Sequence, residues 1–123
     1  MAELHESLLV VFRKKFLHRG YRETKTPMPT YRPDVFAQKI SKKGRVIKEL
    51  IVEAEIRSTL FSNHTAEQLK LMDEYIKHQK RKKIKVVGYL VIPDQKDLYK
   101  HAVMLLDSMY PGENLIKTLS LKV

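Results

Sequence analysis

The sequence predicts an α/β domain in which helices flank a mixed β-sheet. Apolar residues recur at helical spacing in three segments, β-branched runs of strand length lie between them, and one Gly-containing turn joins two of these runs as a hairpin. A hairpin followed by strand-helix-strand connections favours a sheet with both antiparallel and parallel pairs. The 123 residues suit a single domain, since one core commonly takes about 100–150 residues.

The first helix is predicted over residues 2–19. Leu4, Leu8 and Phe12 recur at helical spacing and form its apolar stripe, and Gly20 is expected to stop it. Residues 21–26 are predicted to form a short strand. Prolines at positions 27, 29 and 33 then prevent regular structure until residue 34.

The rest of the chain alternates between strand-like and helical segments. Two strands, residues 34–40 and 46–56, flank a turn at 41–44 and form a predicted hairpin. A helix capped by Asn63 or Thr65 and running to about Lys80 follows, then a buried strand over 83–92, a helix from Asp94 or Gln95 to Met109, and a last strand over 115–123. The predicted order is α-β-β-β-α-β-α-β.

The charge balance is strongly basic. Lysine and arginine number 24 against 14 aspartate and glutamate residues, which gives a formal net charge of +10. An excess this large indicates an acidic partner, of which nucleic acid is the commonest. A membrane surface, or a basic protein with no polyanionic partner, remains an alternative.

Composition excludes several kinds of chemistry. The chain has no cysteine, so disulfides, thiolate metal sites and cysteine nucleophiles are excluded. The first residues lack a signal-peptide pattern, and the apolar runs are far shorter than the ~20 residues of a membrane helix. We therefore expect a cytoplasmic protein that does not enter the membrane.

Three acidic residues of the predicted hairpin are candidates for a shared site. Strand side chains alternate, so Glu53 and Glu55 point to the same face, with their Cα atoms about 6.6–7 Å apart. If residues 43–44 form a two-residue turn, Asp34 falls opposite Glu53. The same turn would pair Lys42 with Arg45. All three carboxylates would then converge on one patch.

Three carboxylates that lie this close repel one another unless a cation lies between them. Their hard oxygen ligands favour Mg²⁺, Mn²⁺ or Ca²⁺ over Zn²⁺. The alternative is an exposed sheet face on which these acids pair with neighbouring lysine and arginine residues.

Pro33-Asp34 followed by Glu53-Ala54-Glu55, within an α-β-β-β-α-β order, resembles the PD-(D/E)XK nuclease superfamily over residues 3–93. The resemblance implies a restriction-endonuclease-like core, with the last helix and strand added to it. Among its members, the chain looks most like small archaeal Holliday-junction resolvases and viral or plasmid nucleases. It implies a Mg²⁺ site formed by Asp34 and Glu53, with Mn²⁺ able to substitute.

Other candidate residues follow from the same resemblance. Many members carry a glutamate on the first helix near the metal, which matches Glu6 here, with Glu3 as the second choice. Many also carry a glutamine at the start of the next helix, which matches Gln68. The implied activity is metal-assisted hydrolysis of DNA phosphodiesters; the sequence leaves RNA open as a substrate.

One position departs from the superfamily pattern, because its lysine is Glu55 here. Some restriction endonucleases of this fold also have glutamate at this position. Glu55 could ligate the metal or orient the attacking water. Arg57, on the same strand face by parity, could supply the missing cation, whereas Lys39 is on the face opposite Asp34.

Two basic groups are candidate phosphate contacts. Lys42 and Lys43 form the predicted hairpin tip, and the second group surrounds the end of the second helix, with members Lys80, Arg81, Lys82 and Lys83. A solvated charged turn and cations that favour a helix C-terminus are the respective alternatives. Further candidates for contact with nucleic acid or metal are Tyr31 as a stacking residue, Ser58, Thr59 and His64.

Three functional hypotheses follow. The first is a Mg²⁺-dependent DNA endonuclease. The second, favoured by Glu55 in place of lysine, is a nucleic-acid-binding module on the same fold without catalysis. The third is an unrelated basic α/β protein. For the nuclease we also predict a homodimer through the third helix or the last strand, because two sites are needed to cut two strands.

Overall fold

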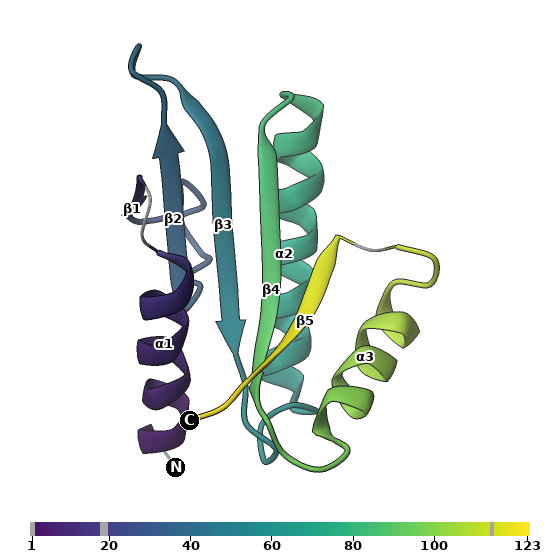
Figure 1. Ribbon diagram of the computed structural model, residues 1–123. Helices are drawn as coiled ribbons and strands as arrows, with labels where there is room; N and C mark the ends of the chain where they lie inside the picture. The colour runs from purple at the N-terminus through teal and green to yellow at the C-terminus, as the bar shows by residue number, and fades with distance from the viewer. Residues whose placement is uncertain (1, 18–19, 114) are drawn as a thin grey trace.

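The computed structural model describes residues 2–17, 20–113 and 115–123. Its elements follow the predicted order, α-β-β-β-α-β-α-β (Figure 1). Their bounds are α1 Ala2–Phe16, β1 Tyr21–Glu23, β2 Val35–Ile40, β3 Val46–Ala54, α2 Asn63–Arg81, β4 Lys85–Pro93, α3 Leu98–Met109 and β5 Ile116–Leu121.

Most boundaries differ from the predicted ones by one to three residues. Leu17 already lies outside α1, so the predicted end at residue 19 was too late; residues 18 and 19 lie outside the described part of the chain. The strand β1 stops at Glu23 rather than at residue 26, and α3 begins at Leu98 rather than near residue 95.

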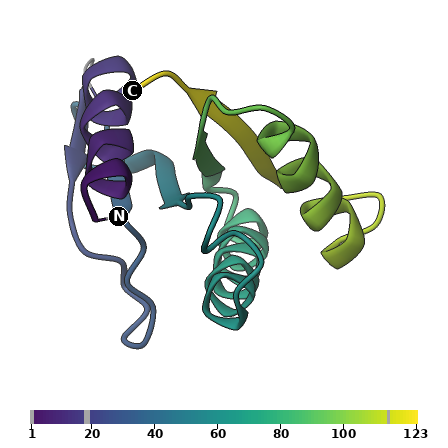
Figure 2. The same ribbon diagram turned by 90° about the horizontal axis from the view of Figure 1, so that it is seen from below.

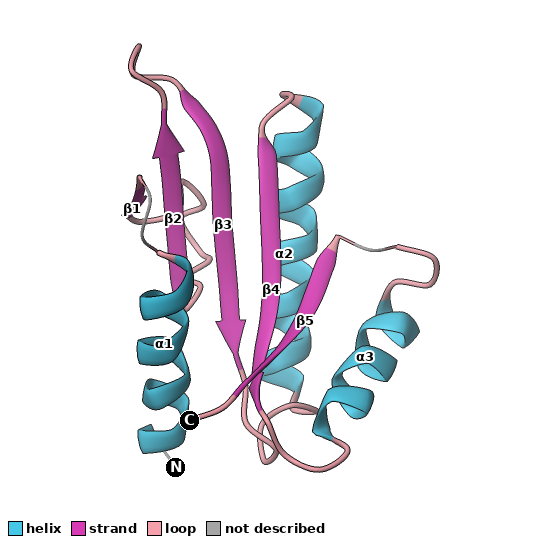
Figure 3. Ribbon diagram, viewed as in Figure 1, coloured by secondary structure: helices cyan, strands magenta, loops and turns pink. Residues whose placement is uncertain are grey.

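The five strands form one mixed sheet in the order β1-β2-β3-β4-β5 (Figure 3). The strands β1, β2 and β3 pair antiparallel, whereas β3 pairs with β4, and β4 with β5, in parallel. The predicted α/β class with a mixed sheet flanked by helices is therefore confirmed.

Helices cover both faces of this sheet. Leu8 and Phe12 of α1 pack against β3 residues such as Leu50 on one face. The other face carries Ile51 and is covered by α2 and α3. Figure 2 shows α1 and α2 on opposite sides of the sheet. Among the described residues, none of the helices combines the length and the apolar character needed to cross a bilayer.

The side chains of α2 pack closely over a glycine of the sheet. A Cβ added to Gly88 on β4 would lie 2.7 Å from Ile76 Cδ1 and 3.0 Å from Met72 Sδ. Both atoms are the ends of flexible side chains, which would have to shift to admit a Cβ at this position.

The hairpin turn differs from the predicted one. Ser41 N donates to Arg45 O at 2.8 Å, so residues 42–44 form a three-residue loop, and the predicted pairing of Lys42 with Arg45 is wrong. Gly44 has φ +79°, a left-handed conformation that glycine adopts without strain. A bulge next to the loop then leaves Ile47 of β3 without a partner on β2.

These two deviations cancel further along the hairpin. Beyond the bulge, Val35 lies opposite Val52. The next pair in this register is Asp34 and Glu53, as predicted. The end of the hairpin away from its turn therefore carries the acidic residues, and it adjoins the connection from β3 to α2.

Candidate metal centre

Asp34, Glu53 and Glu55 converge in the structure. One carboxylate oxygen from each residue lies within 4.8 Å of the others. Glu53 and Glu55 are buried, and Asp34 is half-buried. The predicted convergence of the three side chains is thus present, and it does not take the alternative form of an exposed face of ion pairs.

Asp34 joins the beginning of β2 to the end of β3. Its Oδ2 accepts a hydrogen bond from Ala54 N at 2.8 Å and lies 3.1 Å from His5 Nε2 on α1. The carboxylate is therefore held from the sheet and from the helix on the opposite face, which fixes its orientation toward Glu53.

Glu53 is oriented by a buried tyrosine. The Tyr31 hydroxyl donates to Glu53 Oε2 at 2.8 Å. Burial, and after it the nearby Asp34 carboxylate, raise the pKa of Glu53 to about 9, whereas the Tyr31 hydrogen bond acts in the opposite direction. Without a cation, this side chain is therefore protonated at neutral pH.

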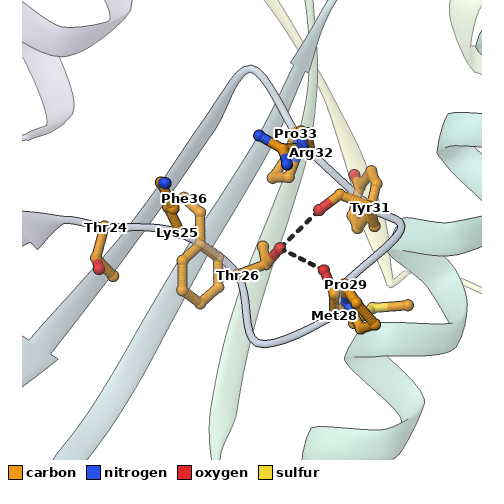
Figure 4. Close-up of a pocket in the computed structure, with 9 residues that line it drawn as sticks. All are labelled: Thr24, Lys25, Thr26, Met28, Pro29, Tyr31, Arg32, Pro33 and Phe36. Carbon is orange, nitrogen blue, oxygen red and sulfur yellow. Dashed lines mark hydrogen bonds between the residues drawn. The ribbon is translucent and has the colours of Figure 1, made fainter.

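The prediction that Tyr31 stacks on a base is wrong, because its side chain is fully buried. The loop between β1 and β2 directs it inward. Thr26 Oγ1 lies 2.7 Å from Tyr31 O and 3.4 Å from Met28 O, contacts that close the loop on itself (Figure 4). Tyr31 is thus a support for Glu53 and unavailable to a ligand.

Glu55 is held at the start of α2. The Thr65 hydroxyl donates to Glu55 Oε1 at 2.7 Å. The N-cap of α2 is Ser62, whose Oγ accepts from Thr65 N at 3.1 Å, so the predicted caps Asn63 and Thr65 were wrong by one and three residues. Helix N-termini favour negative charge, which suits a carboxylate at this place.

One oxygen of each acid is engaged by a protein donor. Asp34 Oδ1, Glu53 Oε1 and Glu55 Oε2 accept a hydrogen bond from no N–H or O–H group of the residues that the structure describes. Three carboxylates supply hard oxygen donors, and the pKa of one of them, Glu53, is raised. This group fits a divalent cation of the Mg²⁺ or Mn²⁺ type.

The three acids open into a cleft of about 440 Å³. Gln68 lines it, as the resemblance implied, together with the further candidates Ser58, Thr59 and His64. The other residues around it are His5, Arg32, Asp34, Glu53, Glu55, Ile56 and Ser62.

Three candidates, Glu6, Glu3 and Arg57, are not among the residues that line this cleft. The Glu6 side chain is 69% exposed and approaches His5 Nδ1 at 3.7 Å, while its neighbour His5 contacts Asp34. Successive helical residues point about 100° apart, so position 5 faces the cluster and position 6 faces solvent; Glu3 is also exposed. Arg57 Nη2 donates to Lys96 O at 2.6 Å, which directs it toward the connection before α3.

Two ionisable residues of the cleft, His5 and Arg32, were not predicted from the sequence. Arg32 directly precedes Pro33-Asp34, and this adjacency was the available signal for it. It lines the cleft, which the predicted cation Arg57 does not.

The predicted phosphate contacts lie away from the acids. Lys42 and Lys43 are exposed in the hairpin turn, at the opposite end of β2 and β3 from the carboxylates (Figure 1). The second group lies around the C-terminal end of α2, whose other end holds Glu55 through Thr65. Arg81 and Lys82 line a hollow there, whereas Lys80 and Lys83 are exposed beside it.

Comparisons with known protein families, with characterised proteins and with solved structures found no match to this chain.

Proposed function

We propose that this protein is a metal-dependent nuclease that hydrolyses DNA phosphodiester bonds. The observation that carries the proposal is the group of three carboxylates, Asp34, Glu53 and Glu55, whose oxygens lie within 4.8 Å of one another at the edge of a cleft in a basic protein. The resemblance to PD-(D/E)XK nucleases supports the same assignment, with Mg²⁺ as the ion and Mn²⁺ able to substitute.

Asp34 and Glu53 would hold the ion. Such an ion polarises a phosphate and lowers the pKa of water. His5 and Ala54 N keep Asp34 oriented, and Tyr31 does the same for Glu53. Uptake of the ion requires Glu53 to give up its proton, so a proton competes with the ion for this site.

Glu55 and Arg32 would together replace the superfamily's lysine, which positions the attacking water and offsets charge. Glu55, held by Thr65, can accept a proton from the attacking water. Arg32 carries the positive charge to the same cleft, where it can offset the charge of the phosphate. Gln68 lines the cleft and can orient a polar group of the substrate.

The second candidate is a nucleic-acid-binding module that does not catalyse cleavage. Glu55 in place of lysine favours it, because it leaves three carboxylates around the reacting phosphate. Dimerisation through α3 or β5 and a cytoplasmic location stay predictions. Met104 on α3 is 57% exposed and β5 is an edge of the sheet, which leaves both surfaces available.

The test is incubation with supercoiled, linear and four-way-junction DNA in Mg²⁺ or Mn²⁺. We expect cleavage by the wild type and a loss of more than about a hundredfold in Asp34→Asn and Glu53→Gln. Asp107→Asn, at an exposed acid of α3, is the control and keeps its activity. No cleavage of any substrate in either ion, with salt-sensitive binding intact in both variants, would favour the binding module and refute the nuclease.

A further inference from the structure

Three hollows follow the segment between β1 and β2, residues 24–34, which we call the linking loop. The first is the cleft of the carboxylates. The second, of about 320 Å³, shares Arg32 with it. The third, of about 540 Å³, shares Met28 and Pro29 with the second and reaches the C-terminal end of α2. The hollows therefore adjoin one another and lead from the acids to the basic end of α2. Figure 4 shows the linking loop around the second hollow.

The charge along this path is positive beyond the acids. Lys25 and Arg32 line the second hollow, and Arg81 and Lys82 line the third; all four side chains are exposed. Glu74 is the acidic residue among those that line the second and third hollows. Lys77 also lines the third but is paired with Asp73 and Glu113 at 3.0 Å each. A polyanion is the occupant that this charge favours.

Apolar surface lies between these cations. Pro27 and Pro29 are exposed on the linking loop, Met28 is half-buried beside them, and Phe36 and Tyr75 form the floors of the second and third hollows. A duplex presents its phosphates outward and keeps the faces of its bases stacked inside. A single strand exposes those faces, so it can use cations and apolar walls together.

Resting on the proposed nuclease function, we infer that a single strand of DNA that leaves the carboxylate cleft runs along the linking loop to the C-terminal end of α2. Its phosphates contact Lys25, Arg32 and Arg81, and its bases lie against the apolar walls. The linking loop and the C-terminal end of α2, which are distant in sequence, thus extend the binding site beyond the metal centre. The preferred substrate carries an unpaired strand of several nucleotides next to the cleaved bond.

Binding of fluorescein-labelled oligothymidylates of increasing length, measured by fluorescence anisotropy in EDTA, tests this inference. EDTA prevents metal-dependent cleavage, so binding is measured alone. We expect affinity to rise with length until the path is filled. The logarithm of the association constant decreases with the logarithm of the salt concentration, and each phosphate contact to a single strand contributes about 0.7 to the steepness of this decrease. In the double variant Lys25→Gln plus Arg81→Gln we therefore expect the decrease to be shallower by about 1.4.

Lys100→Gln on α3 removes one exposed lysine outside the path and is the matched control. It keeps the wild-type slope, and thermal unfolding of all variants checks that they fold. Equal slopes in the double variant and the wild type, affinity that does not depend on length, or tighter binding of duplex DNA or of RNA of the same sequence would each overturn the inference.

The two proposals fail separately. Loss of length-dependent binding overturns the strand path and leaves the metal centre untouched, because no cleavage enters this measurement. Length-dependent binding by a protein that cleaves no DNA overturns the nuclease and leaves a surface for single-stranded DNA.

Discussion

Two glutamates of β3, four residues apart on the face toward α2, are both buried but differ in their hydrogen-bond donors and in the charge of their neighbours. Glu49 is 1% exposed and Glu53 is 4% exposed. Glu49 Oε1 accepts from Tyr75 Oη and from Gln79 Nε2, each at 2.7 Å, and its Oε2 accepts from Gln38 Nε2 at 2.8 Å. Both of its oxygens are thus satisfied by neutral donors.

Glu53 has one such donor, Tyr31, and two acids beside it. Its neighbours oppose its charge, whereas those of Glu49 accommodate a carboxylate. Burial of an acid therefore does not by itself make a site. What distinguishes the candidate metal centre is that Glu53 holds a proton at neutral pH unless a cation takes its place beside the other two acids.

The largest effect is expected at the satisfied acid. Glu49→Ala leaves the donors of Tyr75, Gln79 and Gln38 without their acceptor. Because each buried unsatisfied group costs about 1–3 kcal/mol, we expect a loss of at least about 3 kcal/mol in the free energy of unfolding, measured with urea. Glu49→Gln, which keeps one acceptor oxygen, loses less. Equal stability of Glu49→Ala and wild type would show that this network does not support the fold.

The second effect is the pH dependence of stability that Glu53 confers. Glu53 has a folded pKa of about 9, above its ordinary value of 4.5, so the native state keeps a proton that the unfolded chain releases. The contribution of Glu53 to the stability of the metal-free protein is then highest below pH 4.5 and falls by about 1.4 kcal/mol per pH unit up to pH 9. Glu53→Gln removes this slope.

The measurement is the difference in unfolding free energy between wild type and Glu53→Gln in EDTA, at about pH 6 and pH 8. We expect Glu53→Gln to gain about 2.7 kcal/mol on the wild type over this interval. A constant difference between the two proteins would mean that Glu53 titrates near its ordinary pKa, and the contrast with Glu49 would lose its electrostatic basis.

The third effect is the response to the ion. At a Mn²⁺ concentration about ten times the dissociation constant, binding to the native state adds about 1.4 kcal/mol to the wild type. Glu53→Gln removes this gain, whereas Glu49→Gln, the same change at the other acid, keeps it. Thermal unfolding with and without Mn²⁺ decides the matter, and a gain retained in Glu53→Gln would exclude this cluster as the ion site.

These contrasts also separate what the sequence predicts from what it does not. The order of elements follows from the hydrophobic periodicity. The pairing of Asp34 with Glu53 was predicted from a wrong turn, and it holds because the loop at Gly44 and the bulge at Ile47 shift the register by opposite amounts. Side-chain parity along β3 then placed Glu55 beside Glu53 without further information.

The remaining residues depend on contacts between distant segments. Glu49 is held by donors up to 30 residues away, and no local pattern marks it. His5 replaces Glu6 because one helical position changes the direction of a side chain by about 100°. Arg32 replaces Arg57 in the cleft because the connection after β3 turns Arg57 toward Lys96.

The smallest effect concerns the two tyrosines that support these acids. Tyr31→Phe removes the hydrogen bond that lowers the Glu53 pKa, so an ion must displace a proton that is held more firmly. A hydrogen bond of this kind is worth about 1 kcal/mol, which corresponds to roughly a fivefold loss in Mn²⁺ affinity. Tyr75→Phe makes the same change beside Glu49 and should lower stability without altering ion affinity. Titration calorimetry with Mn²⁺ compares the two variants. Equal losses of Mn²⁺ affinity in the two variants would mean that the tyrosines act through the packing of α2 and the linking loop. The hydrogen bond from Tyr31 to Glu53 would then have no specific effect on ion binding.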